Sequence, residues 1–230
     1  MKKLVVLTGA GMSAESGIST FRDSGGLWEQ YKIEDVATPD AFARNPELVH
    51  HFYNLRRKQL VEAQPNMGHY GLVKLEEYFD VQIITQNVDN LHERAGSIDV
   101  LHLHGELMKM RSTGRDEIVY DVQSDKLEYT TSDLCPRGFP LRPHIVWFGE
   151  MVPEMDRAVM DVQKADIVVV IGTSLQVYPA AGLLHYAQRD TPVYLIDPND
   201  VTVGNRTIIH IKKGASEGVE QLQELLKPLH

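Results

Sequence analysis

Continuous apolar runs recur along the chain and predict strands that are buried on both faces. They cover residues 4–7, 81–85, 167–171 and 193–196, with a further candidate at 100–103. Continuous rather than alternating apolar residues are typical of parallel strands covered by helices. Helical patterns accompany these runs at residues 68–78, 90–95, 179–188 and 218–226. This alternation predicts an α/β fold with a doubly wound, Rossmann-like parallel sheet.

Two segments interrupt the alternation and predict a smaller inserted domain. Residues 29–65 have a helical pattern, and residues 106–150 are rich in Thr, Asp, Arg and Pro, with strand-like pieces at 118–122 and 145–148. We therefore expect one catalytic unit with a large domain from residues 1–28, 66–105 and 151–230. Its small domain is expected from 29–65 and 106–150. Because ligands of such sheets bind outside the carboxyl ends of the strands, the cleft between the domains is the expected active site.

Composition narrows the class of protein and its partners. Of 230 residues, 43% are hydrophobic, which allows a sizeable core, and the net charge of -9 argues against a nucleic-acid surface. The one cysteine, Cys135, excludes an intramolecular disulfide and a multi-cysteine metal site, and it favours a reducing compartment. The apolar run at the N-terminus is too short for a signal peptide, and no run is long enough to span a membrane. We expect a cytoplasmic, monomeric protein without a membrane partner.

A glycine turn follows the first predicted strand and reads Gly9-Ala10-Gly11-Met12-Ser13. A strand, a glycine turn and a helix together offer backbone N–H groups to a phosphate, and the two glycines would let the backbone approach a pyrophosphate. The GAGMSAESG pattern departs from GxGxxG, so this segment alone leaves open an ordinary strand–turn–helix connection. The polar stretch at residues 17–28 is either a surface loop or a lid over a ligand.

Polar side chains also gather where the next strands end. Residues 85–92 read TQNVDNLH. Helix capping requires only one polar residue, and this segment contains several. His104 follows the strand candidate at 100–103 and precedes a glycine, so it is expected to be exposed and able to act as a general base. His102 lies two residues earlier on the same predicted strand face. We favour His104 as the base.

Several motifs occur in the same order as in a known family: GAGMSAESGISTFRD, TQNVDNLH, HLHGE, VWFGE and GTSLQVYP. From about residue 4 to 226 the chain resembles the sirtuins, which are NAD-dependent protein-lysine deacylases. The resemblance implies a Rossmann-like large domain and a small domain made of a helical module and a zinc ribbon.

The resemblance also assigns roles to matching positions. It implies His104 as the catalytic base, with Asn87 and Asp89 beside the nicotinamide, and Ala215 beside the adenine. The residues implied to bind the cofactor are Gly9, Ala10, Gly11, Ser13, Ala14, Thr20, Phe21, Arg22, Trp28, Gln86, Asn87, Val88, Asp89, Gly172, Thr173, Ser174, Asp197, Asn199 and Ala215. The residues implied to pair with a substrate peptide as an added strand are Val146, Phe148, Gly149 and Glu150.

The implied reaction consumes NAD and one water molecule and transfers an acyl group from a protein lysine to the ribose of NAD. Its products are free lysine, nicotinamide and O-acyl-ADP-ribose. Two alternatives share the same cofactor residues, namely a mono-ADP-ribosyltransferase and a non-catalytic sensor that binds NAD or O-acyl-ADP-ribose. A catalytic base at His104 argues against the sensor, because binding alone does not require one.

The chain departs from the family at the zinc ribbon. Four cysteine thiolates normally complete a tetrahedral zinc site, whereas this chain has only Cys135. Asp133 and His144 are conceivable substitute ligands. We predict that zinc is absent and that packing alone holds this module together.

The segment FYNLRR suggests which acyl group is recognised. Tyr53 and Arg56 lie three residues apart in a helical pattern, so they share a face. They match the Tyr-x-x-Arg pair of sirtuins that prefer succinyl, malonyl and glutaryl groups, and Ala37 matches a small residue that lines the same pocket. Arginine and tyrosine can both donate hydrogen bonds to a carboxylate. We therefore expect Arg56 to bind the acyl carboxylate and Arg57 to face solvent.

Overall fold

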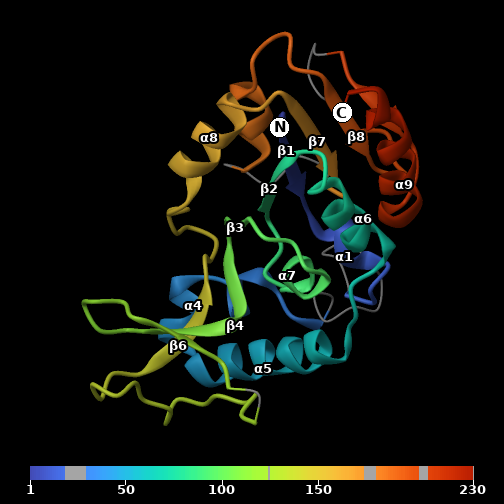
Figure 1. The fold of residues 1–230 in the computed structure, drawn as a ribbon. Coiled ribbons are helices and arrows are strands. Elements are labelled where there is room, and N and C mark those ends of the chain that lie inside the picture. The colour runs from blue at the N-terminus through green and yellow to red at the C-terminus, as the bar shows by residue number, and fades with distance from the viewer. Residues whose placement is uncertain (19–29, 124, 174–179, 202–206, 230) are drawn as a thin grey trace.

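The larger part of the molecule is a layered α/β domain built on one parallel sheet (Figure 1). The computed structural model describes residues 1–18, 30–123, 125–173, 180–201 and 207–229. The six-stranded sheet has the order β3-β2-β1-β7-β8-β9, and every pair is parallel. Its strands are β1 (Lys3–Thr8), β2 (Asp80–Thr85), β3 (Val100–His102), β7 (Ile167–Ile171), β8 (Val193–Ile196) and β9 (Ile209–Ile211). This confirms the predicted doubly wound sheet and adds the short edge strand β9.

Helices cover both faces of this sheet, which explains its continuous apolar strands. On one face, α6 (Met67–Leu75) and α9 (Ala215–Leu226) pack against side chains that include Leu4 and Val6. On the other, α8 (Met155–Gln163) and the 3₁₀ helix η1 (Ala180–Tyr186) pack against a core that includes Val5 and Leu7. The short elements α1 (Ala10–Ala14), α7 (Leu91–Ala95) and η2 (Lys227–Leu229) complete this domain. The sequence patterns did not predict α8.

In the described residues, the smaller part combines a group of helices with a second sheet. The helices are α3 (Ile33–Val36), α4 (Pro39–Arg44) and α5 (Pro46–Glu62). Side-chain caps fix the starts of the latter two, because Thr38 accepts from the Ala41 N–H and Asn45 accepts from the Leu48 N–H. The antiparallel sheet has the order β5-β4-β6, formed by β4 (Gly105–Ser112), β5 (Val119–Asp121) and β6 (Leu141–Ile145).

The structure corrects the predicted position of Arg57, which is fully buried at 0% exposure. Its Nε donates to the Leu107 carbonyl at 3.0 Å, and Nη1 donates to Asn54 Oδ1 at 2.6 Å and to the Leu127 carbonyl at 3.4 Å. Asn54 in turn bonds both the N–H and the carbonyl of Tyr129. Because two backbone carbonyls, the Asn54 side chain and the Met110 sulfur accept from the guanidinium, it can be buried without a carboxylate partner. This cluster ties α5 to the small sheet.

The small sheet does not assemble the donors of a tetrahedral zinc site. Cys135 is buried in the core of this sheet, and Ser112 Oγ lies 3.5 Å from its sulfur. Asp133 is engaged by Lys126 and by the Thr130 N–H. Side chains along β6 point alternately to its two faces. His144 therefore lies on the face opposite Leu141, which packs with Cys135. Within the described ranges, no group of three or more His, Cys, Asp or Glu side chains could hold a metal ion.

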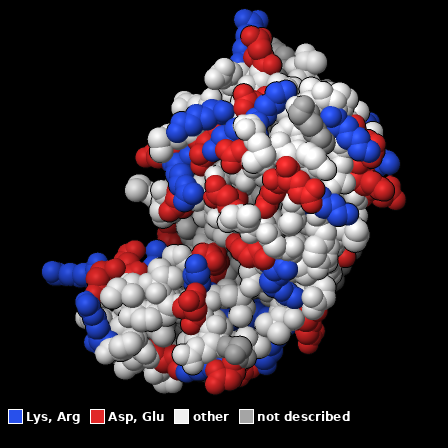
Figure 2. All heavy atoms as spheres, in the orientation of Figure 1, with Lys and Arg blue, Asp and Glu red and all other residues white. Residues whose placement is uncertain are grey.

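Charge is mixed over the face shown in Figure 2, where lysines and arginines alternate with aspartates and glutamates. That face carries no continuous basic surface of the kind that binds a nucleic-acid backbone. No helix in the described part of the chain is both long and apolar enough to cross a membrane.

Replacement of Arg57 tests its structural role. Arg57→Met leaves the carbonyls of Leu107 and Leu127 without this donor, and we expect the free energy of unfolding to fall by about 3 kcal/mol in urea denaturation. The matched control is Lys58→Met, because Lys58 is the exposed neighbour on the same helix. Equal effects of the two substitutions would contradict the assignment.

Metal analysis tests the prediction that zinc is absent. We expect purified protein to contain zinc well below one equivalent and to keep its melting temperature in EDTA, because one thiol and a hydroxyl are a poor donor set. Stoichiometric zinc that chelators remove with loss of stability would overturn this prediction.

Candidate active site

The carboxyl ends of β1 and β7 meet where the strand order of the sheet reverses, the usual position of a ligand in this class of fold. The turn after β1 is fixed there by backbone hydrogen bonds. The Gly9 N–H donates to the Ile171 carbonyl at 3.0 Å, and the Gly11 N–H donates to the Gly172 carbonyl at 2.8 Å. These bonds place the short helix α1 against the end of β7.

The glycines are required by a close contact inside the chain, whatever ligand approaches this turn. A Cβ on Gly11 would lie 2.6 Å from the Gly172 Cα, and one on Gly9 would lie 2.6 Å from the Thr173 Cβ. Gly172 has a φ of 59°, a left-handed conformation that favours glycine. The space beside Gly9 and Gly11 is therefore filled by the chain itself, and their N–H groups already have acceptors.

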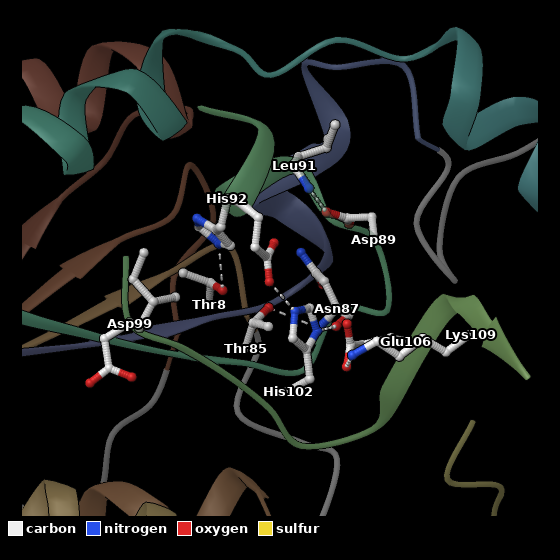
Figure 3. A network of polar contacts seen from close by, with 12 residues as sticks. Thr8, Thr85, Asn87, Asp89, Leu91, His92, Asp99, His102, Glu106 and Lys109 are labelled. Carbon is white, nitrogen blue, oxygen red and sulfur yellow. Dashed lines mark hydrogen bonds and ion pairs between the residues drawn. The ribbon is translucent and has the colours of Figure 1, made fainter. Parts of the chain in front are cut away.

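A buried network joins α1 to the loop after β2. Ser13 Oγ donates to Asp89 Oδ2 at 2.9 Å, and Asn87 Nδ2 donates to the Gly9 carbonyl at 3.0 Å and lies 3.2 Å from Ser13 Oγ. Asp89 also accepts from the Leu91 N–H at 3.1 Å, as Figure 3 shows. Burial raises the pKa of Asp89, while the hydrogen bonds from Leu91 and Ser13 oppose that shift. The network holds three of the predicted site residues, Ser13, Asn87 and Asp89, in one place.

Gln86 connects this loop to two further strand ends. Its Nε2 donates to Thr173 Oγ1 at 3.2 Å, and its carbonyl lies 3.0 Å from His104 Nδ1. Since a carbonyl can only accept, His104 carries its proton on Nδ1 when neutral, which leaves a lone pair on Nε2. Burial lowers the pKa of His104, so the imidazole is neutral and basic near pH 7.

The pKa values of the two neighbouring histidines shift in opposite directions. His102 Nδ1 lies 3.1 Å from the Asn87 carbonyl, and His102 Nε2 lies 2.7 Å from a Glu93 carboxylate oxygen. Both ring nitrogens therefore face acceptors. Burial alone would lower the pKa of His102, but Glu93 reverses the effect and raises it. Both nitrogens of His102 are thus engaged, and His104 is the histidine with an available lone pair.

Sequence reasoning missed polar groups at the same strand ends. Thr8 and Thr85 are register partners and are both fully buried, and Thr8 Oγ1 lies 3.2 Å from His92 Nε2 (Figure 3). Asn90 Oδ1 is buried and has no hydrogen-bond donor in the described part of the chain. A buried acceptor without a donor is costly, so this atom is suited to meet a ligand N–H or O–H. The only sequence signal was the polar run that contains Asn90.

The remaining predicted cofactor residues have different environments. Asp197 follows β8, and its Oδ1 accepts from the N–H of Asn199 at 2.9 Å. Ala215 is buried in the core between α9 and α6, and Ala14 is exposed. Ala10 and Val88 are partly buried at the same edge of the sheet as Gly9 and Asn87. The predicted residues that lie outside the described part are Thr20, Phe21, Arg22, Trp28 and Ser174.

The predicted acyl-group residues belong to one cluster beside this edge. Ala37, Tyr53 and Trp147 share a buried apolar core, and Tyr53 is only 1% exposed. The Arg56 Cζ lies 6.0 Å from the centre of the Tyr53 ring. Burial lowers the pKa of Arg56, whereas the charges of Tyr53 and Asp89 raise it.

The predicted peptide-binding segment at residues 146–150 is a turn after β6 rather than a strand, so the strand expected at 145–148 ends at Ile145. Its N–H groups already donate within the chain: Val146 to His104, Phe148 to Ala37, and Glu150 to Trp147. The Trp147 N–H donates to Glu150 Oε2 at 2.7 Å, and Arg142 binds both oxygens of that carboxylate. Glu150 therefore shapes the turn. Of the backbone N–H groups in this segment, that of Gly149 has no acceptor within the described chain.

Comparisons with known proteins agree with this geometry. The family model described as the Sir2 family matches residues 9–179. A protein of Bacteroides thetaiotaomicron named NAD-dependent protein deacylase is 59% identical over 233 residues, which cover 99% of each chain. A protein of the same name from Aggregatibacter actinomycetemcomitans is 56% identical over 198 residues, 86% of this chain and 94% of that protein.

Among solved structures, a Sir2 homologue in complex with NAD aligns with a TM-score of 0.90 and 41% identity, covering 99% of this chain and 90% of that chain. The family match covers well over half of the sequence, and the relatives align over most of their own length. The chain belongs to the Sir2 family.

Proposed function

We propose that this protein is an NAD-dependent protein-lysine deacylase that prefers acidic acyl groups such as succinyl and malonyl. NAD-dependent protein deacylation is the activity named for its curated relatives, which reach 59% identity. The preference for acidic groups is supported by the arrangement of Tyr53 and Arg56 beside the polar edge of the sheet.

The donor set at the strand ends fits a dinucleotide. Hydroxyl and amide groups of Ser13, Gln86, Asn87 and Thr173 converge where the strand order reverses, and Asn90 Oδ1 is a buried acceptor in need of a donor. NAD, when bound, supplies the ribose that accepts the acyl group and the nicotinamide that leaves. In this arrangement Asn87 and Asp89 are held rigidly by Ser13, so they can orient the ring without rearrangement.

His104 is proposed as the general base that takes the proton from the attacking ribose hydroxyl. Its Nδ1–H is held by the Gln86 carbonyl, which directs the Nε2 lone pair away from that backbone. A neutral imidazole with a fixed tautomer is suited to this role.

The single observation that carries the acidic-acyl preference is the pairing of a buried phenol with a guanidinium. Burial raises the pKa of Tyr53 to about 12, so its hydroxyl keeps its proton and remains a donor near neutral pH. Arg56 supplies a positive charge about one helical turn away on α5. A carboxylate bound between them would receive hydrogen bonds from both, in a site with little water. Ala37 adds little volume to this cluster.

The catalytic role of His104 is tested against its neighbour. His104→Gln removes the base, and we expect turnover to fall about 10²- to 10⁴-fold. The wild-type kcat/KM should fall on the acid side below pH 6.5, because the lowered pKa of His104 keeps the base form down to that range. His102→Gln is the matched control and should retain most of its turnover in folded protein. Equal losses in the two variants would contradict the assignment.

Arg56→Met tests the acyl preference. We expect kcat/KM for a succinyl-lysine peptide to fall about 100-fold, because a charge-assisted interaction in a dry pocket is lost. The acetyl-lysine peptide of the same sequence should change far less, since its acyl group carries no charge. Lys58→Met, an exposed cation on the same helix, is the control for net charge. Equal losses on the two peptides would exclude the carboxylate-binding role.

A further inference from the structure

Trp147 is joined to the proposed acyl site by one specific hydrogen bond. Its Nε1–H donates to the Tyr53 hydroxyl oxygen at 2.9 Å, and the two side chains are 2% and 1% exposed. Trp147 comes from the turn after β6, whereas Tyr53 lies on α5, so the bond crosses between distant segments of the small domain. Indole nitrogen can only donate, which fixes the direction of the bond.

The direction of this bond determines what the Tyr53 hydroxyl can still do. A phenol has one proton to donate and a lone-pair side that accepts. The indole N–H of Trp147 occupies the lone-pair side, and the hydroxyl proton has no acceptor among the described residues. A buried donor without an acceptor costs free energy, so this proton is suited to a ligand oxygen. Burial raises the pKa of Tyr53 to about 12, which keeps that proton in place.

Trp147 is itself held from both sides. The Arg142 Cζ lies 3.5 Å from its ring centre, and Glu150 accepts from Arg142 at 2.7 and 3.0 Å. The Phe42 ring lies 5.3 Å away, centre to centre. Stacking of a guanidinium on an indole restricts the ring, so the N–H has little freedom to leave the Tyr53 oxygen.

We propose that Trp147 is a positioning residue for acyl selectivity: its indole N–H occupies the lone-pair side of the Tyr53 hydroxyl and thereby directs the hydroxyl proton to the carboxylate of an acidic acyl group. This inference rests on the proposed acidic-acyl preference. It assigns a role to the indole nitrogen that no apolar aromatic side chain can fill. The aromatic ring itself contributes packing, which is independent of the acyl charge.

A double-mutant cycle separates the two contributions. Trp147→Phe, Tyr53→Phe and the double variant are assayed with succinyl- and acetyl-lysine peptides of one sequence. We expect Trp147→Phe to lower the succinyl-to-acetyl ratio of kcat/KM about tenfold, the equivalent of one hydrogen bond. In the Tyr53→Phe background the same substitution should leave the ratio unchanged, because no hydroxyl remains to be directed. The same drop in both backgrounds, or equal losses on both peptides, would overturn the proposal.

Phe42→Leu is the packing control. It disturbs the ring beside Trp147 without touching the hydrogen bond, so it should affect the two peptides equally. Arg56→Met distinguishes a failure of the Trp147 role from a failure of the acidic-acyl preference. If Arg56→Met lowers the ratio and Trp147→Phe does not, only the role of Trp147 is wrong. If neither substitution lowers it, the acidic-acyl preference and the role of Trp147 both fail.

Discussion

The close backbone contact between Gly11 and Gly172 sets the geometry of the site. Hydrogen bonds from Gly9 and Gly11 fix the turn after β1 against the end of β7, and a Cβ on Gly11 would lie 2.6 Å from the Gly172 Cα. Because this turn cannot shift, Ser13 is held toward Asp89, and Asn87 can bond the Gly9 carbonyl. The polar network therefore takes its position from a contact between main chains, which tolerates no side chain at either glycine.

Helix α5 directs two adjacent arginines, Arg56 and Arg57, to different sides. Successive residues in a helix are rotated by about 100°, so Arg56 and Arg57 cannot share an environment. Arg57 bonds carbonyls of the small sheet and of the loop that precedes Tyr129, while Arg56 lies beside Tyr53 within reach of the Asp89 charge. One helix thus anchors the small sheet and offers a cation to the site.

The sheet could be predicted from sequence because its strands are apolar on both faces, a property visible without knowledge of their neighbours. The environment of Arg57 could not be predicted in the same way. Its acceptors at Leu107 and Leu127 lie 50 and 70 residues away, and only the fold brings them together. The polar run at residues 85–92 was also visible in the sequence, and the structure places two of its residues, Asn87 and Asp89, in a buried network with Ser13. The glycine turn was visible in the sequence, but its close contact with Gly172 was not, because that residue lies about 160 positions away and only the fold brings it there.

The two histidines show how the fold gives different chemistry to similar residues. In sequence, His102 and His104 lie two residues apart, and only the following glycine and the strand end favour His104 as the base. In the structure, a carboxylate and a carbonyl face the two nitrogens of His102, whereas a single carbonyl faces His104. A charged acceptor stabilises an imidazolium, and a lone carbonyl in a buried position only selects a tautomer. Glu93 therefore accounts for the difference between the two histidines: its carboxylate raises the pKa of His102, whereas burial without such a partner lowers the pKa of His104.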